Sequence, residues 1–154
     1  MSNTSRLKEL GLELPPAPAP AGVYKPVVVV GDMAYVSGHG PLGYDKKLTT
    51  GRLGADMDVE AGYAAARLTG LGILATLEKQ LGSLDRIERV VKLLGLVRCT
   101  DDFEAPPAVI NGCSELFREV FGEEKGVGAR SALGTNALPG GIAVEIEAIF
   151  QLNA

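Results

Sequence analysis

The chain has 154 residues, of which 46% are hydrophobic and 22% are charged. These fractions are close to those of globular proteins, so they exclude a disordered or fibrous chain and predict a single domain over residues 1–154. Binding to DNA or RNA requires a basic surface stripe. The formal net charge of −4 therefore argues against nucleic acid as the main partner.

The first 22 residues are predicted to be an extension that precedes the sheet. Residues 4–11 form a short helix, in which Ser5 is the expected N-cap and Gly11 ends the last turn. The proline-rich segment LPPAPAPAG, residues 14–22, follows the helix. Its prolines exclude a helix or a central strand, so we expect an extended connector.

Two short strands come next. Residues 27–30 are four valines and residues 33–38 are MAYVSG, and the Gly31-Asp32 pair between them is typical of a tight hairpin turn. Residues 40–56 contain four glycines and are expected to form a loop.

A long amphipathic helix is predicted between Asp58, a good N-cap, and Gly82, a good C-terminal stop. Apolar residues recur between them at every third or fourth position, for about six turns. Small residues, including Gly70 and Gly72, make the middle of this helix thin. We therefore expect it to pack closely on a sheet or on another backbone.

The second half of the chain supplies one more helix and three strands. Residues 88–99 are predicted to be a strand with a bulge at Gly95, and a helix starts at Pro106-Pro107 and ends at Gly122. A loop (residues 123–128) and two strands (residues 129–135 and 142–152) complete the chain. The order ββ-α-β-α-ββ predicts an α+β fold, a mixed sheet with both helices on one face.

The other face of the sheet would then be uncovered. It carries apolar residues together with Glu145 and Glu147, and a lone sheet does not leave a large apolar face in water. We therefore expect this face to pack against copies of the chain in a closed ring.

Arg130 and Glu145 are the strongest candidates for chemistry. An arginine fork matches a carboxylate with two parallel hydrogen bonds, so Arg130 is a candidate clamp for a substrate carboxylate. A glutamate nearby can hold a water molecule and take its proton. The alternative is that Arg130 and Glu145 form a structural pair across neighbouring strands.

Four other residues have both a functional and a structural interpretation. Tyr24 either lines a site or packs with its hydroxyl outward, and Ser37 either donates to a ligand or caps a turn. His39, the only histidine, lies between two glycines, which favours a loop residue over a catalyst. Asn111 lies among apolar residues and faces either solvent or a pocket.

Several classes of site and location are excluded. Cys99 and Cys113 are the only cysteines, so we expect core thiols in a reduced setting rather than a disulfide framework. The single histidine excludes a multi-histidine metal site. No nucleotide or zinc motif occurs, no apolar run approaches about 18 residues, and the N-terminus has no apolar leader segment. We expect a cytoplasmic protein without a metal or cofactor.

The chain resembles the RidA/YjgF family, also called endoribonuclease L-PSP proteins, over roughly residues 17–152. Four stretches carry the resemblance: APAPAGVY, VSGHGPL, FEAPPAVINGCSELFREVFG and ARSALGTNALPGGIAVEIEAIF. The last is the most specific, because the arginine, the Leu-Pro pair and the strand VEIEA keep the family's order. The N-terminal helix resembles that of a subgroup with an extended N-terminus.

The resemblance implies a chorismate-mutase-like fold and a homotrimer with three clefts between subunits. It also implies hydrolysis of reactive 2-enamine and 2-imine acids, of the 2-aminoacrylate type, to 2-keto acids and ammonia. Arg130 would grip the substrate carboxylate and Glu145 would activate the attacking water. The residues that would line the cleft by the same resemblance are Tyr24, Ser37, Gly38 and Asn111.

Three positions depart from the family pattern. Ala132 replaces the usual cysteine, Val23 the usual proline, and His39 the usual glutamine. We therefore expect carboxylate binding to be retained and substrate choice to have changed. A protein that binds a small 2-keto acid without turnover is the alternative. An endoribonuclease is disfavoured by the acidic balance and by the lack of an aromatic stacking platform.

Overall fold

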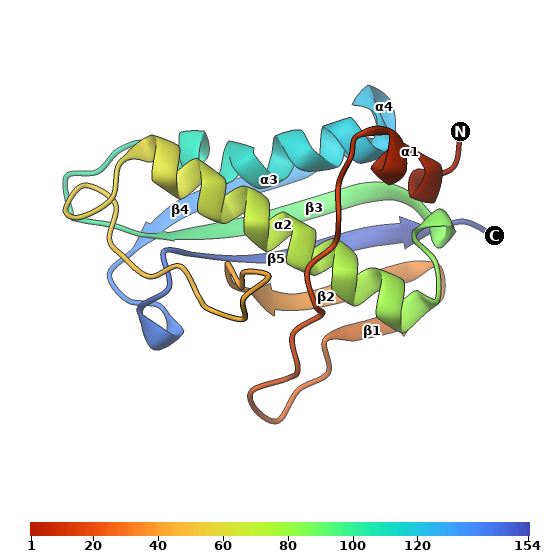
Figure 1. Cartoon of the computed structure of the whole chain (residues 1–154), viewed down its shortest axis with the longest axis horizontal. Coiled ribbons are helices and arrows are strands. Elements are labelled where there is room, and N and C mark those ends of the chain that lie inside the picture. The colour runs from red at the N-terminus through yellow and green to blue at the C-terminus, as the bar shows by residue number, and fades with distance from the viewer.

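One five-stranded sheet carries two long helices on one face, as Figure 1 shows for the computed structural model, which describes residues 1–154. In chain order the elements are α1 (Asn3–Glu9), β1 (Val27–Val30), β2 (Met33–His39), α2 (Val59–Leu81), β3 (Ile87–Arg98), α3 (Pro106–Phe121), α4 (Glu123–Gly126), β4 (Ala129–Thr135) and β5 (Val144–Leu152). Short 3-10 turns span Leu84–Arg86 and Pro139–Gly141. The predicted α+β class and the order ββ-α-β-α-ββ are confirmed.

The sheet is mixed, with strand order β1-β2-β5-β3-β4. β3 and β4 run parallel, and α3 is the crossover that joins them, whereas all other neighbours are antiparallel. β4 is therefore an edge strand, and β3 separates it from β5. This order decides which candidate residues can meet within one chain.

Helix α2 begins and ends where the sequence predicts. The Asp58 carboxylate accepts a hydrogen bond from the Ala61 N–H at 2.9 Å, and Gly82 closes the helix with φ 86°, a left-handed value that favours glycine. Its thin middle packs against α3: a Cβ at Gly70 would lie 3.1 Å from the Cys113 sulfur. The predicted close packing is confirmed.

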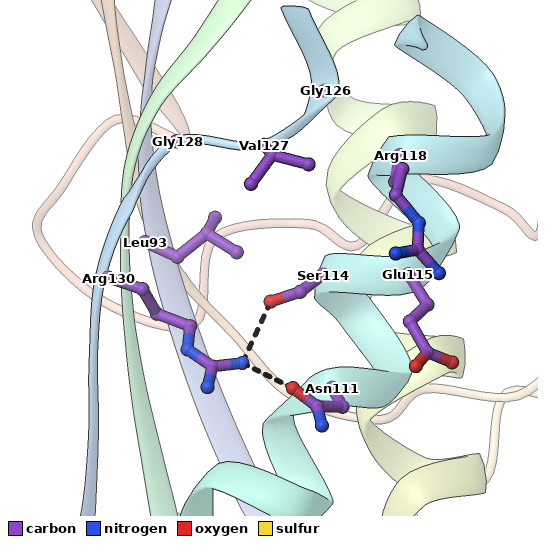
Figure 2. A pocket seen from close by; sticks show the side chains of 9 residues that line it. All are labelled: Leu93, Asn111, Ser114, Glu115, Arg118, Gly126, Val127, Gly128 and Arg130. Carbon is purple, nitrogen blue, oxygen red and sulfur yellow. Dashed lines mark hydrogen bonds between the residues drawn. The ribbon is translucent and has the colours of Figure 1, made fainter. Parts of the chain in front are cut away.

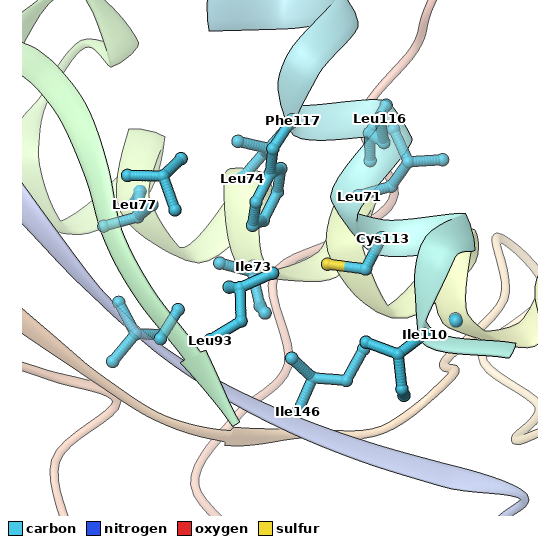
Figure 3. Packing of buried hydrophobic residues seen from close by; sticks show 14 of the residues in the cluster. Leu71, Ile73, Leu74, Leu77, Leu93, Ile110, Cys113, Leu116, Phe117 and Ile146 are labelled. Atoms are coloured by element: carbon cyan, nitrogen blue, oxygen red, sulfur yellow. The ribbon is translucent and has the colours of Figure 1, made fainter. Parts of the chain in front are cut away.

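The core lies between the two helices and the covered face of the sheet. Figure 3 shows Cys113, Leu116 and Phe117 of α3 among side chains of α2 and the strands. All three residues are fully buried, and the rings of Phe117 and Phe150 meet edge to face at 5.6 Å. Both cysteines are buried and free, as predicted.

Three local predictions are wrong. Ser2, not Ser5, caps α1, because its hydroxyl oxygen accepts from the Ser5 N–H at 3.0 Å. Gly95 is not a bulge; a Cβ there would lie 2.6 Å from Ile110, so the glycine makes room for α3. Residues 123–128 are not all loop, since α4 occupies Glu123–Gly126.

The open face of the sheet carries apolar side chains in contact with solvent. Val28, Tyr35 and Leu133 are 46%, 44% and 52% exposed, on strands β1, β2 and β4. Packing of this face against copies of the chain stays a prediction. None of the helices is both long and apolar enough to span a bilayer.

Gly112 tests the contact between the two long helices. A Cβ at Gly112 would lie 2.0 Å from the Tyr63 carbonyl oxygen of α2, so G112A must push the helices apart. We expect it to lower the free energy of unfolding by about 1–3 kcal/mol, the range for overpacking. The measurement is denaturant unfolding.

G72A is the matched control, because a Cβ at this α2 position meets nothing within 4 Å. Alanine is the better helix former, so G72A should raise the free energy of unfolding by about 0.5–1 kcal/mol. Equal effects of the two substitutions would contradict the close approach at Gly112.

Candidate functional site

Arg130 projects from edge strand β4 toward α3. It pairs with buried Leu93 in the sheet register, which places its side chain on the helix-covered face. Its Nη1 donates to Asn111 Oδ1 at 2.7 Å and to Ser114 Oγ at 3.2 Å (Figure 2). Asn111 and Ser114 are three residues apart, so one face of α3 presents both.

The arginine pocket has a volume of about 330 Å³ and lies between β4, α3 and the end of α4. Arg130 is exposed and takes no part in any of the chain's four ion pairs. Both hydrogen bonds use Nη1, which leaves Nε and Nη2 as a fork for an incoming carboxylate. Residues that line the pocket are Leu93, Asn111, Ser114, Glu115, Arg118, Gly126, Val127, Gly128 and Arg130.

Glu145 lies on the opposite, open face of the sheet. It pairs with Leu96 of β3, and its carboxyl group lies against Gly38, where a Cβ would be 3.0 Å from Oε2. Burial, and secondly the negative charge of Glu147, raise the pKa of Glu145 above its ordinary value. A carboxyl group in such a setting is suited to accept and return a proton.

Two more predicted residues lie near Glu145. The Ser37 hydroxyl donates to the Lys25 carbonyl at 2.5 Å, and the Ala21 N–H donates to the Tyr24 hydroxyl at 3.2 Å. Tyr24, Ser37, Gly38 and Glu145 all line one open groove of about 630 Å³, which we call the glutamate groove. Its other lining residues are Pro18, Ala19, Pro20, Ala21, Pro26, His39, Gly40, Leu42, Leu48, Pro139, Ile142 and Glu147.

His39 is neither a loop residue nor an exposed catalyst. It is the last residue of β2 and only 5% exposed. Nδ1 lies 2.6 Å from the Ser37 carbonyl, which only accepts, so Nδ1 carries the proton and Nε2 accepts from the Thr76 hydroxyl at 2.7 Å. His39 thus ties the site end of β2 to α2 as a neutral imidazole.

One chain does not bring the predicted residues into a single site. Arg130 and Asn111 lie in the arginine pocket, whereas Tyr24, Ser37, Gly38 and Glu145 lie in the glutamate groove. The structural pair of Arg130 with Glu145 is excluded, because β3 separates their strands and their side chains lie on opposite faces. The sheet separates them by about 10 Å across the strands and about 10 Å along them.

Three features of the candidate site were not predicted from the sequence. Ser114 holds Arg130, and its spacing of three from Asn111 on a helix was the available signal. Glu147 raises the pKa of Glu145, and strand alternation already placed the two on one face. The proline-rich segment forms a wall of the groove, which no local pattern indicated.

Residues 4–141 match the model of a protein family described as "YjgF/chorismate mutase-like, putative endoribonuclease". The chain belongs to this family. It is 43% identical over 149 residues to Protein TCP17 of Trypanosoma cruzi, an alignment that covers 97% of this chain and 93% of the relative. The relationship therefore extends over almost the whole chain.

Two solved structures have the same fold. A protein with unknown function from Agrobacterium tumefaciens is 40% identical, with a TM-score of 0.88, and the match covers 99% of this chain and 94% of the other. RidA from an Antarctic Psychrobacter species is 31% identical, with a TM-score of 0.61, and the match covers 88% and 93%.

The buried histidine predicts a pH-dependent stability. Burial lowers the pKa of His39 below 6.5, although its bond to the Ser37 carbonyl opposes this. Because the unfolded chain binds the proton more tightly, the stabilisation is complete above pH 6.5 and declines as the pH falls below it. We expect wild type to lose up to about 1.4 kcal/mol more than H39Q per pH unit in that range.

The comparison is free of other histidines because His39 is the only one in the chain. Denaturant unfolding of wild type and H39Q at pH 7.5, 6.5 and 5.5 measures the difference. Parallel stability curves for the two proteins would show that His39 is not held neutral by its surroundings.

Proposed function

We propose that this YjgF-family protein hydrolyses reactive 2-enamine and 2-imine acids to 2-keto acids and ammonia, in clefts between the subunits of a homotrimer. One observation carries the proposal: the chain holds a free, ordered guanidinium on one face of its sheet and a carboxyl group of raised pKa on the other. Each is suited to one half of this reaction.

The arginine pocket supports recognition of the substrate carboxylate. Asn111 and Ser114 orient the Arg130 guanidinium from one side and leave its other edge open. No carboxylate of the chain forms an ion pair with it, so its positive charge is available to an incoming anion. The pocket is also ordered in advance, which reduces the entropic cost of binding.

Glu145 supports the hydrolytic step. An enamine first takes a proton from solvent on its β-carbon to give the iminium ion. A water oxygen then attacks the iminium carbon while Glu145 accepts the water proton, which forms a carbinolamine. Glu145 returns that proton to the nitrogen, the C–N bond breaks, and the carbinolamine hydroxyl releases its proton to solvent as the keto group forms and ammonia leaves.

Holding these groups in register is the main catalytic requirement of the proposal. The iminium carbon is already electrophilic, so fixing the substrate carboxylate and the water provides most of the rate enhancement. The proposed step uses no metal or cofactor.

The separation of the two residues supports a site between subunits. Within one chain, Arg130 and Glu145 lie on opposite faces of the sheet, so the Arg130 of one copy must meet the Glu145 of another. The exposed apolar residues of the open face favour such an assembly, and head-to-tail contacts form a ring where the rotation between copies closes.

Carboxylate binding without turnover is the second candidate. Ala132, two residues beyond Arg130, provides no thiol, and the nearby Cys113 is fully buried with a pKa raised by that burial. The arginine pocket alone is enough for a binding protein. An endoribonuclease is less favoured, because Glu145 and Glu147 would repel the phosphates of RNA.

Removal of the guanidinium tests the carboxylate clamp. R130A should weaken 2-oxobutanoate binding by about 1.5–3 kcal/mol, the range for a hydrogen bond to a charged group. R130K should recover only part of this, because lysine lacks the bidentate fork. Calorimetry gives the affinity, and sedimentation checks that assembly is unchanged; dissociation or unfolding of R130A would instead make Arg130 structural.

R86A is the matched control, since Arg86 is an exposed arginine that lines neither pocket. It should bind 2-oxobutanoate like wild type.

Mixing R130A with E145Q then tests the shared site. After subunit exchange at equal amounts, about one quarter of the interfaces in a ring carry both native residues and should regain imine hydrolysis.

A mixture that stays inactive, from two folded variants that exchange subunits, would contradict a site shared between copies. If the wild-type protein binds 2-oxobutanoate but leaves the lifetime of the imine unchanged, the hydrolase proposal is wrong and the binding protein is the better interpretation.

Glu147 provides a test of the proton acceptor. Glu145 must be ionised to accept a proton, so activity should rise with pH through its raised pKa, with a midpoint above 4.5. In E147Q the neighbouring charge is lost, which lowers the pKa of Glu145 and moves this midpoint to lower pH. The measurement is kcat/KM for imine hydrolysis against pH.

E124Q serves as the control, because Glu124 is an exposed residue of α4 outside both pockets. Its profile should match that of wild type. An unmoved midpoint in E147Q would remove Glu145 as the titrating base.

A further inference from the structure

The N-terminal extension forms one wall of the glutamate groove. Figure 1 shows the segment after α1 passing across α2 toward β1. The Tyr44 hydroxyl donates to the Glu13 carbonyl at 2.5 Å, and Pro15 is buried. Four residues of the segment, Pro18 to Ala21, then line the groove.

The opposite wall comes from the loop after β2. Leu42 and Leu48 pair through an antiparallel bridge, which holds the loop in shape, and both residues line the groove beside Ile142. Leu48 is 47% exposed although it is a large apolar residue. Both walls are therefore ordered and apolar.

The acidic side chains that line the groove are clustered on one strand. The only acidic side chains that line it, Glu145 and Glu147, lie together on β5, and no lysine or arginine lines it. A substrate carboxylate is repelled from this part of the groove, so it must be held elsewhere, in the arginine pocket of another copy. Once the reacting carbon lies at Glu145, the remaining apolar space is available to the substrate's side chain.

We propose that the glutamate groove is a side-chain pocket that selects 2-imino acids with branched or extended apolar side chains over those with a methyl or vinyl group. This inference rests on the proposed function and specifies its substrate class. The groove volume of about 630 Å³ lies within the range of small-molecule sites, about 300–1,000 Å³. A methyl group would leave most of its apolar surface without a contact.

The direct test compares two imines of different size. 2-Imino acids formed in situ by oxidation of leucine and of alanine are supplied to the intact protein, and release of 2-keto acid and ammonia is followed. The kcat/KM for the leucine-derived imine should exceed that for the alanine-derived imine about tenfold or more, as expected for several methylenes in an apolar pocket. Equal values, or a preference for the smaller imine, would overturn the inference.

Two variants locate the selectivity in the groove. L48A removes apolar contact from one wall and should reduce the preference about tenfold. A19W adds bulk at an exposed position of the other wall and should lower kcat/KM for the larger imine more than for the smaller one, so that the preference falls. V59A, at an exposed position that lines neither pocket, should change neither rate.

A second readout separates this inference from the proposed function. Calorimetry with 4-methyl-2-oxopentanoate and with pyruvate measures side-chain selection without turnover. One outcome is that no imine is hydrolysed, the larger keto acid binds more tightly, and L48A removes this difference in affinity. That outcome supports the side-chain pocket and contradicts the proposed hydrolysis. If L48A or A19W changes the assembly size and leaves selection unchanged, the groove holds a neighbouring copy and the inference is overturned.

Discussion

The alternation of side chains along the β-strands places the two candidate groups of this protein on opposite faces of its sheet. Arg130 is paired with a residue of the covered face, and Glu145 with a residue of the open face. No change of rotamer brings the two together, because the sheet itself lies between them. The strand order adds β3 as a spacer, so the separation is a property of topology rather than of loop conformation.

The register shift in β2 connects the core to the groove. Between Val36 and His39 the pairing with β5 is interrupted, and the adjacent residues Gly38 and His39 have different roles. Gly38 faces Glu145 with no side chain of its own, whereas His39 turns inward and bonds to Thr76 of α2. His39 thus fixes the groove end of β2 to α2 through one buried imidazole.

The parts of the fold that depend on local rules were predictable from the sequence. The Asp58 cap, the Gly82 stop and the alternation along β5 each follow from short-range chemistry, and all three are confirmed. Features set by distant contacts were not predictable. Gly95 must be a glycine because Ile110, fifteen positions away, packs against it. The sequence alone does not distinguish a glycine required by such a contact from a glycine at a bulge. Ser2 and Ser5 are equally good caps by type, and only the start of the helix distinguishes them.

The candidate site divides in the same way. Residue chemistry and the family resemblance both indicated Arg130 and Glu145, whereas their placement on opposite faces required the sheet order and register. Separation keeps both groups functional: an ion pair within the chain would neutralise the guanidinium and lower the pKa of the carboxyl group. A single protomer therefore holds a guanidinium outside any ion pair and a carboxyl group of raised pKa, and the proposed function requires a second chain to bring its own sheet edge against the first.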